Sequence, residues 1–256
     1  MKVVILAGGL GTRISEESHL KPKPMIEIDG MPIMWHIMKY YSSFGFNDFI
    51  ICGGYKDYKI KEFFANYYLH TSDMTFDLEN NDLAFHSNNS EKWKITCVNT
   101  GLNTMTGGRI KRIQEHIQNE SFLLTYGDGL SDVNLTKLIN EHQQSKATVT
   151  MTAIQPGGRF GVLEIEESGT VSSFAEKNKE DGGWINGGFM VCNPEVFDYI
   201  QGDEMTFEKE PLEQLAKQGK LHSYKHEGFW QCMDTLRDKE LLEKLIRENK
   251  APWMVW

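Results

Sequence analysis

The chain has 256 residues, of which 40% are hydrophobic and 25% are charged, and its formal net charge at pH 7 is −9. This length and hydrophobic content suffice for one domain with a sizeable core. The acidic balance excludes a broad basic face for nucleic acid or for an anionic membrane surface, whereas a small anionic ligand needs only a few cations placed locally.

The first part of the chain alternates strands and helices. Apolar runs that end at glycine or polar residues predict buried strands over 2–7, 49–52, 94–98, 122–126 and 147–153. Amphipathic patterns predict helices over 32–43, 58–68, 108–118 and 135–145. This order predicts an α/β fold with a Rossmann-like, mostly parallel sheet flanked by helices, in which ligands lie at the C-terminal ends of the strands.

The second part of the chain has a different pattern. Two short runs, 161–165 and 170–174, predict an antiparallel hairpin. Further strands are predicted over 187–192 and 221–225, and further helices over 211–218 and 235–248. We therefore expect a mixed sheet with a small antiparallel β element, within a single domain that spans 1–256.

One polar segment interrupts the alternation. Residues 70–93 are rich in Asn, Asp and Ser and predict an irregular excursion with one short hairpin.

The cysteines and the N-terminal run bear on the compartment. No two of the four cysteines, Cys52, Cys97, Cys192 and Cys232, form a CxxC pair, so we expect reduced thiols and neither a zinc nor a redox motif. The apolar run at 3–7 is shorter than the roughly 7–15 residues of a signal peptide core. No stretch approaches the ~20 apolar residues of a membrane span. These features predict a cytoplasmic protein without membrane contact.

A glycine-rich loop follows the first strand. Residues 8–13 read GGLGTR, and glycines let successive backbone N–H groups point at phosphate oxygens. A dinucleotide fingerprint requires a third glycine where this chain has Ile14, and a Walker loop requires Gly-Lys where it has Arg13-Ile14. What remains is either a phosphate loop that ends in arginine, a side chain suited to phosphate, or an ordinary glycine turn.

A short basic segment lies farther along the chain. Residues 21–25 read KPKPM, and the two prolines hold the backbone extended. A lysine fixed in this way, Lys23, is better placed to meet an α-phosphate than a lysine on a mobile surface. Taken alone, the segment is more typical of a solvated basic loop.

Together these two motifs resemble the signature of the sugar-1-phosphate nucleotidyltransferases. In that family the glycine loop and its arginine hold a nucleoside triphosphate, and the lysine contacts the α-phosphate. A helix start near Thr104 and Arg109 also favours an anion. The nucleotide-binding positions that the resemblance implies are Leu6, Ala7, Gly8, Gly9, Gly11, Thr12, Arg13, Lys23, Thr104, Arg109 and Gly127.

Further stretches narrow the resemblance to one branch of the family. Thymidylyl- and uridylyltransferases usually carry Pro-x-Thr after the arginine, where this chain reads SEES at 15–18. That departure and several other segments are similar to the branch that transfers a cytidylyl group from CTP to glucose 1-phosphate, and the similarity covers 1–256. The segments are 21–28, 32–38, 105–109, 229–231 and 250–253.

The resemblance implies a reaction and a setting. CTP and α-D-glucose 1-phosphate would give CDP-glucose and pyrophosphate, for deoxysugar or O-antigen polysaccharide precursors. A uridylyl-, thymidylyl- or guanylyltransferase that acts on another sugar 1-phosphate, and a non-catalytic nucleotide-binding relative, remain as alternatives. The family forms homo-oligomers, a hexamer being one option, and 70–93 and the tail at 253–256 are candidate contacts; a mobile loop and a docked terminus are the alternative.

Two aspartates are candidate magnesium ligands. Asp128, between Gly127 and Gly129, follows a buried strand, and Mg²⁺ needs only one or two carboxylates besides substrate phosphates. The resemblance places the metal aspartates at Asp128 and at Asp234, although the first is also typical of a tight turn and the second of a helix N-cap. Asp132 is interpreted as a helix cap.

The sugar phosphate has its own candidate residues. The resemblance implies that Lys177 neutralises the sugar phosphate, that Glu176 holds sugar hydroxyls, and that Asn186 and Gly187 approach the sugar edge. Their alternatives are a surface ion pair and a plain turn. The residues expected to act directly on the reacting phosphates are Arg13, Lys23 and Lys177.

Overall fold

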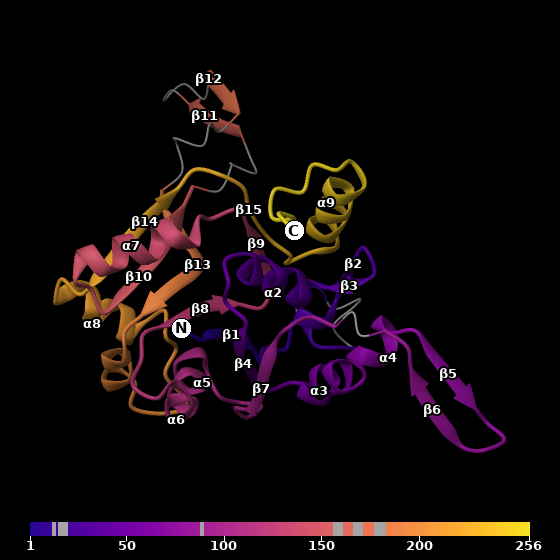
Figure 1. The fold of residues 1–256 in the computed structure, drawn as a ribbon. Coiled ribbons are helices and arrows are strands. Elements are labelled where there is room, and N and C mark those ends of the chain that lie inside the picture. Colours follow the sequence, from indigo (N-terminus) through magenta and orange to yellow (C-terminus); the bar gives the residue numbers. More distant parts are fainter. Residues whose placement is uncertain (12–13, 15–19, 88–89, 156–160, 166–170, 177–182) are drawn as a thin grey trace.

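The structure is a computed structural model, and it describes residues 1–11, 14, 20–87, 90–155, 161–165, 171–176 and 183–256. A seven-stranded sheet lies at its centre, in the order β14-β10-β13-β8-β1-β4-β7 (Figure 1). The seven strands are β1 (Val3–Ala7), β4 (Asp48–Gly53), β7 (Lys94–Asn99), β8 (Phe122–Tyr126), β10 (Val149–Ile154), β13 (Ile185–Cys192) and β14 (Leu221–His226).

The sheet is mostly parallel. β1 pairs in parallel with β4 and β8, β4 with β7, and β10 with β14. Only β13 among these described strands runs antiparallel, to β8 and to β10. The register aligns Leu6 with Cys52 on one side and with Tyr126 on the other, so three strands end at one edge. The predicted α/β fold with a mixed, mostly parallel sheet is confirmed.

Helices cover both faces of this sheet. The α-helices are α2 (Ile33–Ser43), α3 (Asp57–Ala65), α4 (Tyr67–Thr71), α5 (Thr106–Arg112), α6 (Gln114–Ile117), α7 (Leu135–Ser145), α8 (Glu210–Lys217) and α9 (Leu236–Arg247). Two 3₁₀ helices, η2 (Lys23–Met25) and η4 (Pro194–Tyr199), add short turns. In the described part of the chain, each helix is too short or too polar to cross a membrane.

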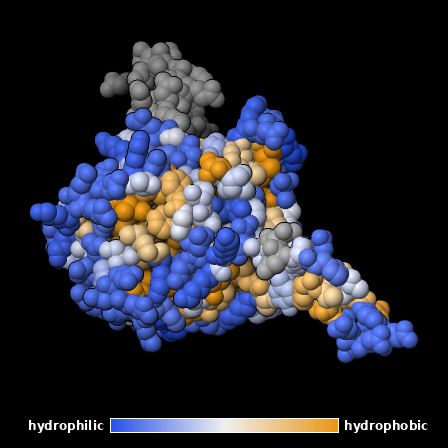
Figure 2. All heavy atoms as spheres, viewed as in Figure 1, coloured by the Kyte–Doolittle hydropathy of each residue, from blue (hydrophilic) through white to orange (hydrophobic). Residues whose placement is uncertain are grey.

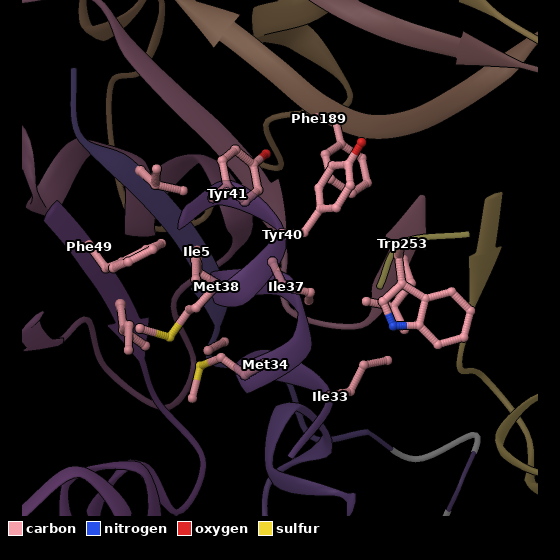
Figure 3. Close-up of a cluster of buried hydrophobic side chains, with 14 of the residues drawn as sticks. Ile5, Ile33, Met34, Ile37, Met38, Tyr40, Tyr41, Phe49, Phe189 and Trp253 are labelled. Atoms are coloured by element: carbon pink, nitrogen blue, oxygen red, sulfur yellow. The ribbon is translucent and has the colours of Figure 1, made fainter. Parts of the chain in front are cut away.

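Alternate residues of β1 face two separate cores. Val3 and Ile5 belong to one core and Val4 and Leu6 to the other, because successive strand residues point to opposite faces. Helices α2, α7 and α9 pack into the first core, and α5, α6, η4 and α8 into the second. Figure 3 shows the first core, where side chains of α2 lie between the sheet and Trp253.

Two predicted helices are each divided in the structure. The helix expected over 58–68 breaks at Asn66, whose side-chain amide donates to the carbonyl of Glu62 at 2.8 Å and so competes with the helical ladder. The helix expected over 108–118 begins at Thr106 instead and is divided at Ile113 into α5 and α6. Gly107 and Gly108 therefore lie inside α5. A side chain at either glycine would lie about 2.5 Å from the backbone of 203–205, which explains these poor helix formers in a first turn.

Four two-stranded ladders surround the central sheet. They are β2 (Glu27–Ile28) with β3 (Met31–Pro32), β5 (Met74–Asp77) with β6 (Asp82–Phe85), β9 (Gly129–Ser131) with β15 (Trp230–Cys232), and β11 (Gly161–Ile165) with β12 (Val171–Glu176). The antiparallel element predicted in the second half is the β11–β12 ladder. The single hairpin expected in the polar segment is β5–β6.

The β5–β6 hairpin projects away from the rest of the molecule (Figure 1). Phe76, Leu78 and Phe85 on it are exposed, Leu78 by 90%. Figure 2 shows hydrophobic residues at its base and a hydrophilic tip. An isolated two-stranded hairpin is marginally stable in water.

The C-terminal tail is docked rather than free. Trp253 is fully buried and stacks on Phe229, with ring centroids 5.3 Å apart. Trp256 lies edge-on to Trp35, and the ammonium group of Lys39 lies over both indoles.

Candidate active site

The edge where β1 and β8 end forms a cavity of about 390 Å³, within the ordinary size range of ligand pockets. Most of the predicted nucleotide-binding residues line it, together with the first metal candidate. They are Leu6, Ala7, Gly8, Gly9, Gly11, Lys23, Thr104, Arg109, Gly127 and Asp128. Pro24, Met105, Thr106 and Tyr126 complete the lining.

Close backbone packing brings the lysine segment to this edge. The N–H of Gly127 donates to the carbonyl of Leu6 at 3.0 Å, which joins the ends of the two strands. A side-chain carbon at Gly127 would lie 2.8 Å from the Pro24 ring, so only glycine allows Pro24 to settle there. Lys23, the residue before Pro24, is thereby held against Asp128.

Lys23 bridges the two candidate metal carboxylates. Its Nζ donates to Asp128 Oδ2 at 2.5 Å and to Asp234 Oδ1 at 2.6 Å, and the lysine is 8% exposed. Burial alone would lower the pKa of Lys23, but the two facing carboxylates outweigh it and hold that pKa above its ordinary value. The two aspartates thus converge on one cation position.

A short ladder joins these distant aspartates. β9 starts at Gly129 and pairs with Cys232 of β15, and the N–H of Met233 donates to the carbonyl of Asp128 at 2.8 Å. Each carboxylate therefore sits at an end of the same antiparallel pair, Asp128 just before β9 and Asp234 just after β15.

The helix-cap interpretations of two aspartates are wrong. The cap of α9 is Thr235, which with Asp238 forms a capping box, so the carboxylate of Asp234 is turned toward Lys23 instead. The cap of α7 is Asn134, not Asp132.

Asp132 supports the short ladder from its other end. Its carboxylate accepts from the backbone N–H of Phe229 at 2.7 Å and pairs with His226 at 2.9 Å. These contacts tie the residue after β9 to the turn that leads into β15, and so they help to fix the register on which the two metal candidates depend.

The side chain of Arg109 holds the backbone of the glycine loop in place. The arginine lies in α5, and its guanidinium donates to the carbonyls of Gly8, Gly53 and Gly101, at 3.0, 3.1 and 2.8 Å. It also donates to the carbonyl of Leu102 and to the hydroxyl of Thr100, and burial lowers its pKa. Arg109 therefore lines the cavity while it ties the ends of β1, β4 and β7 together.

A second group of side chains extends from the lining of the cavity, to which Tyr126 and Thr106 belong. Tyr126 donates from its hydroxyl to Glu208 at 2.6 Å and accepts from the amide of Asn186 at 3.0 Å, while Glu208 also accepts from Thr106 at 2.5 Å. Tyr126, Thr106 and Glu208 are not among the site residues predicted from the sequence, although Thr106 lies within the stretch expected to contact the nucleotide. The only signal for Tyr126 was its place before Gly127, and Glu208 had none.

The remaining predicted residues differ in how far they are described. Thr12, Arg13 and Lys177 lie outside the described residues, and Glu176 is described only as the last residue of β12. Asn186 and Gly187 lie near the start of β13; Asn186 is one hydrogen bond from Tyr126.

Comparisons with known proteins give a consistent assignment. Residues 2–238 match the nucleotidyl transferase family. The chain is 56% identical to the glucose-1-phosphate cytidylyltransferase of Salmonella typhi, with 100% of both chains covered. It is 46% identical to the probable glucose-1-phosphate cytidylyltransferase of Bacillus subtilis (strain 168), again with 100% of both covered.

The fold is also shared with solved structures. HddC from Yersinia pseudotuberculosis superposes with a TM-score of 0.70 at 24% identity, over 96% of this chain and 99% of that one. With the matched family and the two full-length relatives, the assignment is complete: the chain belongs to the nucleotidyl transferase family, in the group of the glucose-1-phosphate cytidylyltransferases.

Proposed function

We propose that the protein transfers the cytidylyl group of CTP to α-D-glucose 1-phosphate, giving CDP-glucose and pyrophosphate. The full-length identity of 56% to a relative of that activity carries the choice of base and sugar. The cavity at the ends of β1 and β8, with Lys23 and two aspartates at its floor, supports nucleotidyl transfer as the chemistry.

The reaction needs no protein nucleophile. An oxygen of the sugar phosphate forms a bond to the α-phosphorus of CTP, the bond from that phosphorus to the oxygen bridging to the β-phosphate breaks, and pyrophosphate leaves with the electron pair. Positioning and charge neutralisation supply most of the catalysis in such transfers. Lys23, kept protonated by its two acidic neighbours, would neutralise charge at the α-phosphate.

The residues present fit a magnesium ion. Asp128 and Asp234 already hold the cationic end of Lys23 at 2.5 and 2.6 Å, so their oxygens converge on a positive charge. Within the described ranges no group of three or more His, Cys, Asp or Glu side chains is placed to hold a metal ion by itself. Two carboxylates with substrate phosphates are a donor set that suits Mg²⁺. When bound, Mg²⁺ would neutralise phosphate charge as a Lewis acid. In its absence Lys23 offsets the repulsion between the two carboxylates.

The two substrates would occupy two sides of the cavity. We define the nucleotide side by the loop at 8–11, Thr104 and Arg109, which line the cavity. We define the sugar side by Asn186 and Gly187, which lie next to the cavity and adjoin its lining through Tyr126. Backbone N–H groups of the glycine loop would hold the triphosphate, with Thr12 beside them. On the family resemblance, Arg13 steadies the departing pyrophosphate, Lys177 neutralises the sugar phosphate and Glu176 holds sugar hydroxyls.

The proposal extends to setting and assembly. All four cysteines are free, which fits the reducing cytoplasm, where nucleoside triphosphates and sugar phosphates are available. The exposed apolar arm β5–β6 fits a contact with a second copy of the chain, in a homo-oligomer for which a hexamer is one option. CDP-glucose would then serve deoxysugar or O-antigen precursor synthesis, the route to lipopolysaccharide.

Product analysis tests this function directly. Purified protein is incubated with CTP, glucose 1-phosphate and MgCl₂, and the products are separated by anion-exchange chromatography and identified by mass. We expect a nucleoside diphosphate sugar and pyrophosphate in equal amounts. CTP that binds in calorimetry but is not turned over with any sugar 1-phosphate would show a non-catalytic relative instead.

A further inference from the structure

Four polar side chains, two of which line the cavity, form a continuous hydrogen-bonded chain. Glu208 accepts hydrogen bonds from the hydroxyls of Tyr126, at 2.6 Å, and of Thr106, at 2.5 Å. Tyr126 accepts from Asn186 Nδ2 at 3.0 Å. The chain therefore connects Thr106 and Tyr126, which line the cavity, with Asn186 on the sugar side.

The chemistry of Glu208 gives this chain a fixed direction. A carboxylate only accepts hydrogen bonds, so both hydroxyls must point their protons at it. The Tyr126 oxygen is then left as an acceptor, which only the NH₂ end of the Asn186 amide can satisfy. The Thr106 oxygen likewise accepts from the backbone N–H of Phe207 at 2.9 Å.

The other end of the Asn186 amide agrees with that direction. Asn186 Oδ1 accepts from the N–H of Gly188 at 2.9 Å. An amide has two orientations that fill the same space, and these two contacts select one of them. The contacts with Tyr126 and Gly188 use one N–H of the amide and one lone pair of its oxygen. A side-chain amide has a second N–H and a second lone pair. A sugar hydroxyl, which both donates and accepts, is complementary to that second pair.

The backbone around Asn186 is held from two sides. Gly188 has a φ of +75°, and a side-chain carbon there would lie 3.0 Å from the ring of Tyr126. Trp230 donates from its indole to the carbonyl of Gly187 at 2.7 Å. With the backbone fixed in this way, the Asn186 side-chain amide could still rotate, and the hydrogen bond from Asn186 to Tyr126, which Glu208 orients, restricts that rotation.

We propose that Tyr126 and Glu208 are positioning residues that orient the amide of Asn186 toward the hydroxyls of the sugar 1-phosphate, and so set discrimination between sugar epimers. The inference rests on the proposed function for the identity of the sugar. It assigns to Glu208, 82 residues from Tyr126 in sequence, an effect on a substrate that it reaches only through two other side chains.

The test compares Tyr126→Phe and Glu208→Gln with the wild type. Phenylalanine keeps the ring against Gly188 but removes the hydroxyl. Glutamine keeps the shape of Glu208 but replaces one of its two acceptor oxygens by an NH₂ donor, so it no longer accepts from both hydroxyls in the same way. Pyrophosphate release is measured with glucose 1-phosphate varied at saturating CTP, and then with CTP varied. We expect both variants to raise the KM for glucose 1-phosphate about tenfold and to leave the KM for CTP within about twofold.

Selectivity and non-additivity distinguish positioning from general damage. The ratio of kcat/KM for glucose 1-phosphate to that for its epimer mannose 1-phosphate should fall about tenfold in Tyr126→Phe, because an unoriented amide no longer discriminates. In the Asn186→Ala background, Tyr126→Phe should add little, since its effect passes through that amide. Tyr199→Phe is the matched control, because its hydroxyl bonds to Gln218 at 2.7 Å outside the cavity.

Two results would overturn the inference. One is an equal rise in both KM values, or none, in variants whose thermal melting matches the wild type. The other is an additive Tyr126→Phe effect in the Asn186→Ala background. If the wild type prefers another sugar 1-phosphate, the proposed function fails and the same comparison is made with that sugar. If the wild type turns over no pair, glucose 1-phosphate binding by calorimetry, wild type against Tyr126→Phe, decides the positioning role: equal affinities would refute it.

Discussion

On the nucleotide side of the cavity the backbone places the key groups, whereas on the sugar side a network of side chains does so. Gly8 follows β1 and Asp128 lies two residues beyond β8, and these strands are parallel neighbours, so their ends must meet. Asn186 instead owes its orientation to Tyr126 and to Glu208, which come from separate parts of the chain. The order of strands in the sequence predicts a site that strand topology alone assembles. It does not predict a site whose side chains are positioned by hydrogen bonds between distant parts of the chain.

The largest expected effect on activity is at Lys23, which lies between the nucleotide side and the sugar side. Lys23→Ala removes the cation at the α-phosphate, and we expect kcat/KM to fall about a thousandfold while circular dichroism shows an intact fold. Lys21→Ala is the matched control, since Lys21 lies in the same basic segment but pairs with the exposed Glu27 at 2.6 Å. Similar turnover by Lys23→Ala and Lys21→Ala would show that Lys23 has no role in the reaction.

The second-largest expected effect on activity comes from changing a proposed metal ligand. Asp128→Asn takes one charged ligand from the proposed Mg²⁺ site, and we expect a loss of about a hundredfold in kcat with a higher Mg²⁺ requirement. Calorimetric titration of Mg²⁺ in the presence of CTP gives a readout independent of turnover. Undiminished wild-type activity in excess EDTA would contradict the metal assignment, and Asp82→Asn on the β5–β6 arm controls for a change of net charge.

A smaller change should separate the two sides of the cavity. In Arg109→Lys an ammonium group replaces the fork that holds the carbonyls of Gly8, Gly53 and Gly101. We expect the KM for CTP to rise about tenfold while the KM for glucose 1-phosphate changes little. Arg112→Lys, at an exposed pair with Asp203, is the control. A rise confined to glucose 1-phosphate would mean that Arg109 serves the other side.

The last effect concerns the stability of the fold and no substrate, because His36 lies outside both sides. Burial lowers the pKa of His36 to about 4, below its ordinary value of 6.5. The unfolded chain therefore binds the proton first as pH falls, so stability is present above pH 6.5 and is lost between 6.5 and 4. We expect about 2 kcal/mol less stability at pH 5 than at pH 7 from this residue. Urea unfolding of the wild type at pH 5 and pH 7 measures this change in the free energy of unfolding. In His36→Gln the change between the two pH values should be smaller. An equal change in the wild type and the variant would contradict the assignment to His36.

Much of the fold followed from hydrophobic pattern. The strands at 122–126 and 161–165 and the helix at 135–145 coincide with β8, β11 and α7. The break at Asn66 and the early start of α5 at Thr106 did not follow, because Asn66 and the packing of Gly107 and Gly108 act through contacts that period and propensity do not contain.

The candidate site divides in the same way. The glycine loop and the strand-end position of Asp128 were readable because both motifs lie directly after buried strands. Asp132 was misread, since a capping residue and a cross-strand acceptor look alike in sequence. Glu208 was invisible because its partners Tyr126 and Thr106 are 82 and 102 residues away.

The central claim is the pairing of CTP with glucose 1-phosphate, and one measurement tests it most directly. Pyrophosphate release by the wild type is followed with CTP, UTP, GTP and dTTP, each combined with glucose 1-phosphate and with mannose 1-phosphate. We predict the highest kcat/KM for CTP with glucose 1-phosphate, by at least about tenfold over every other pair. A higher value for any other pair would contradict the account, because it would place this chain in a different branch of its family.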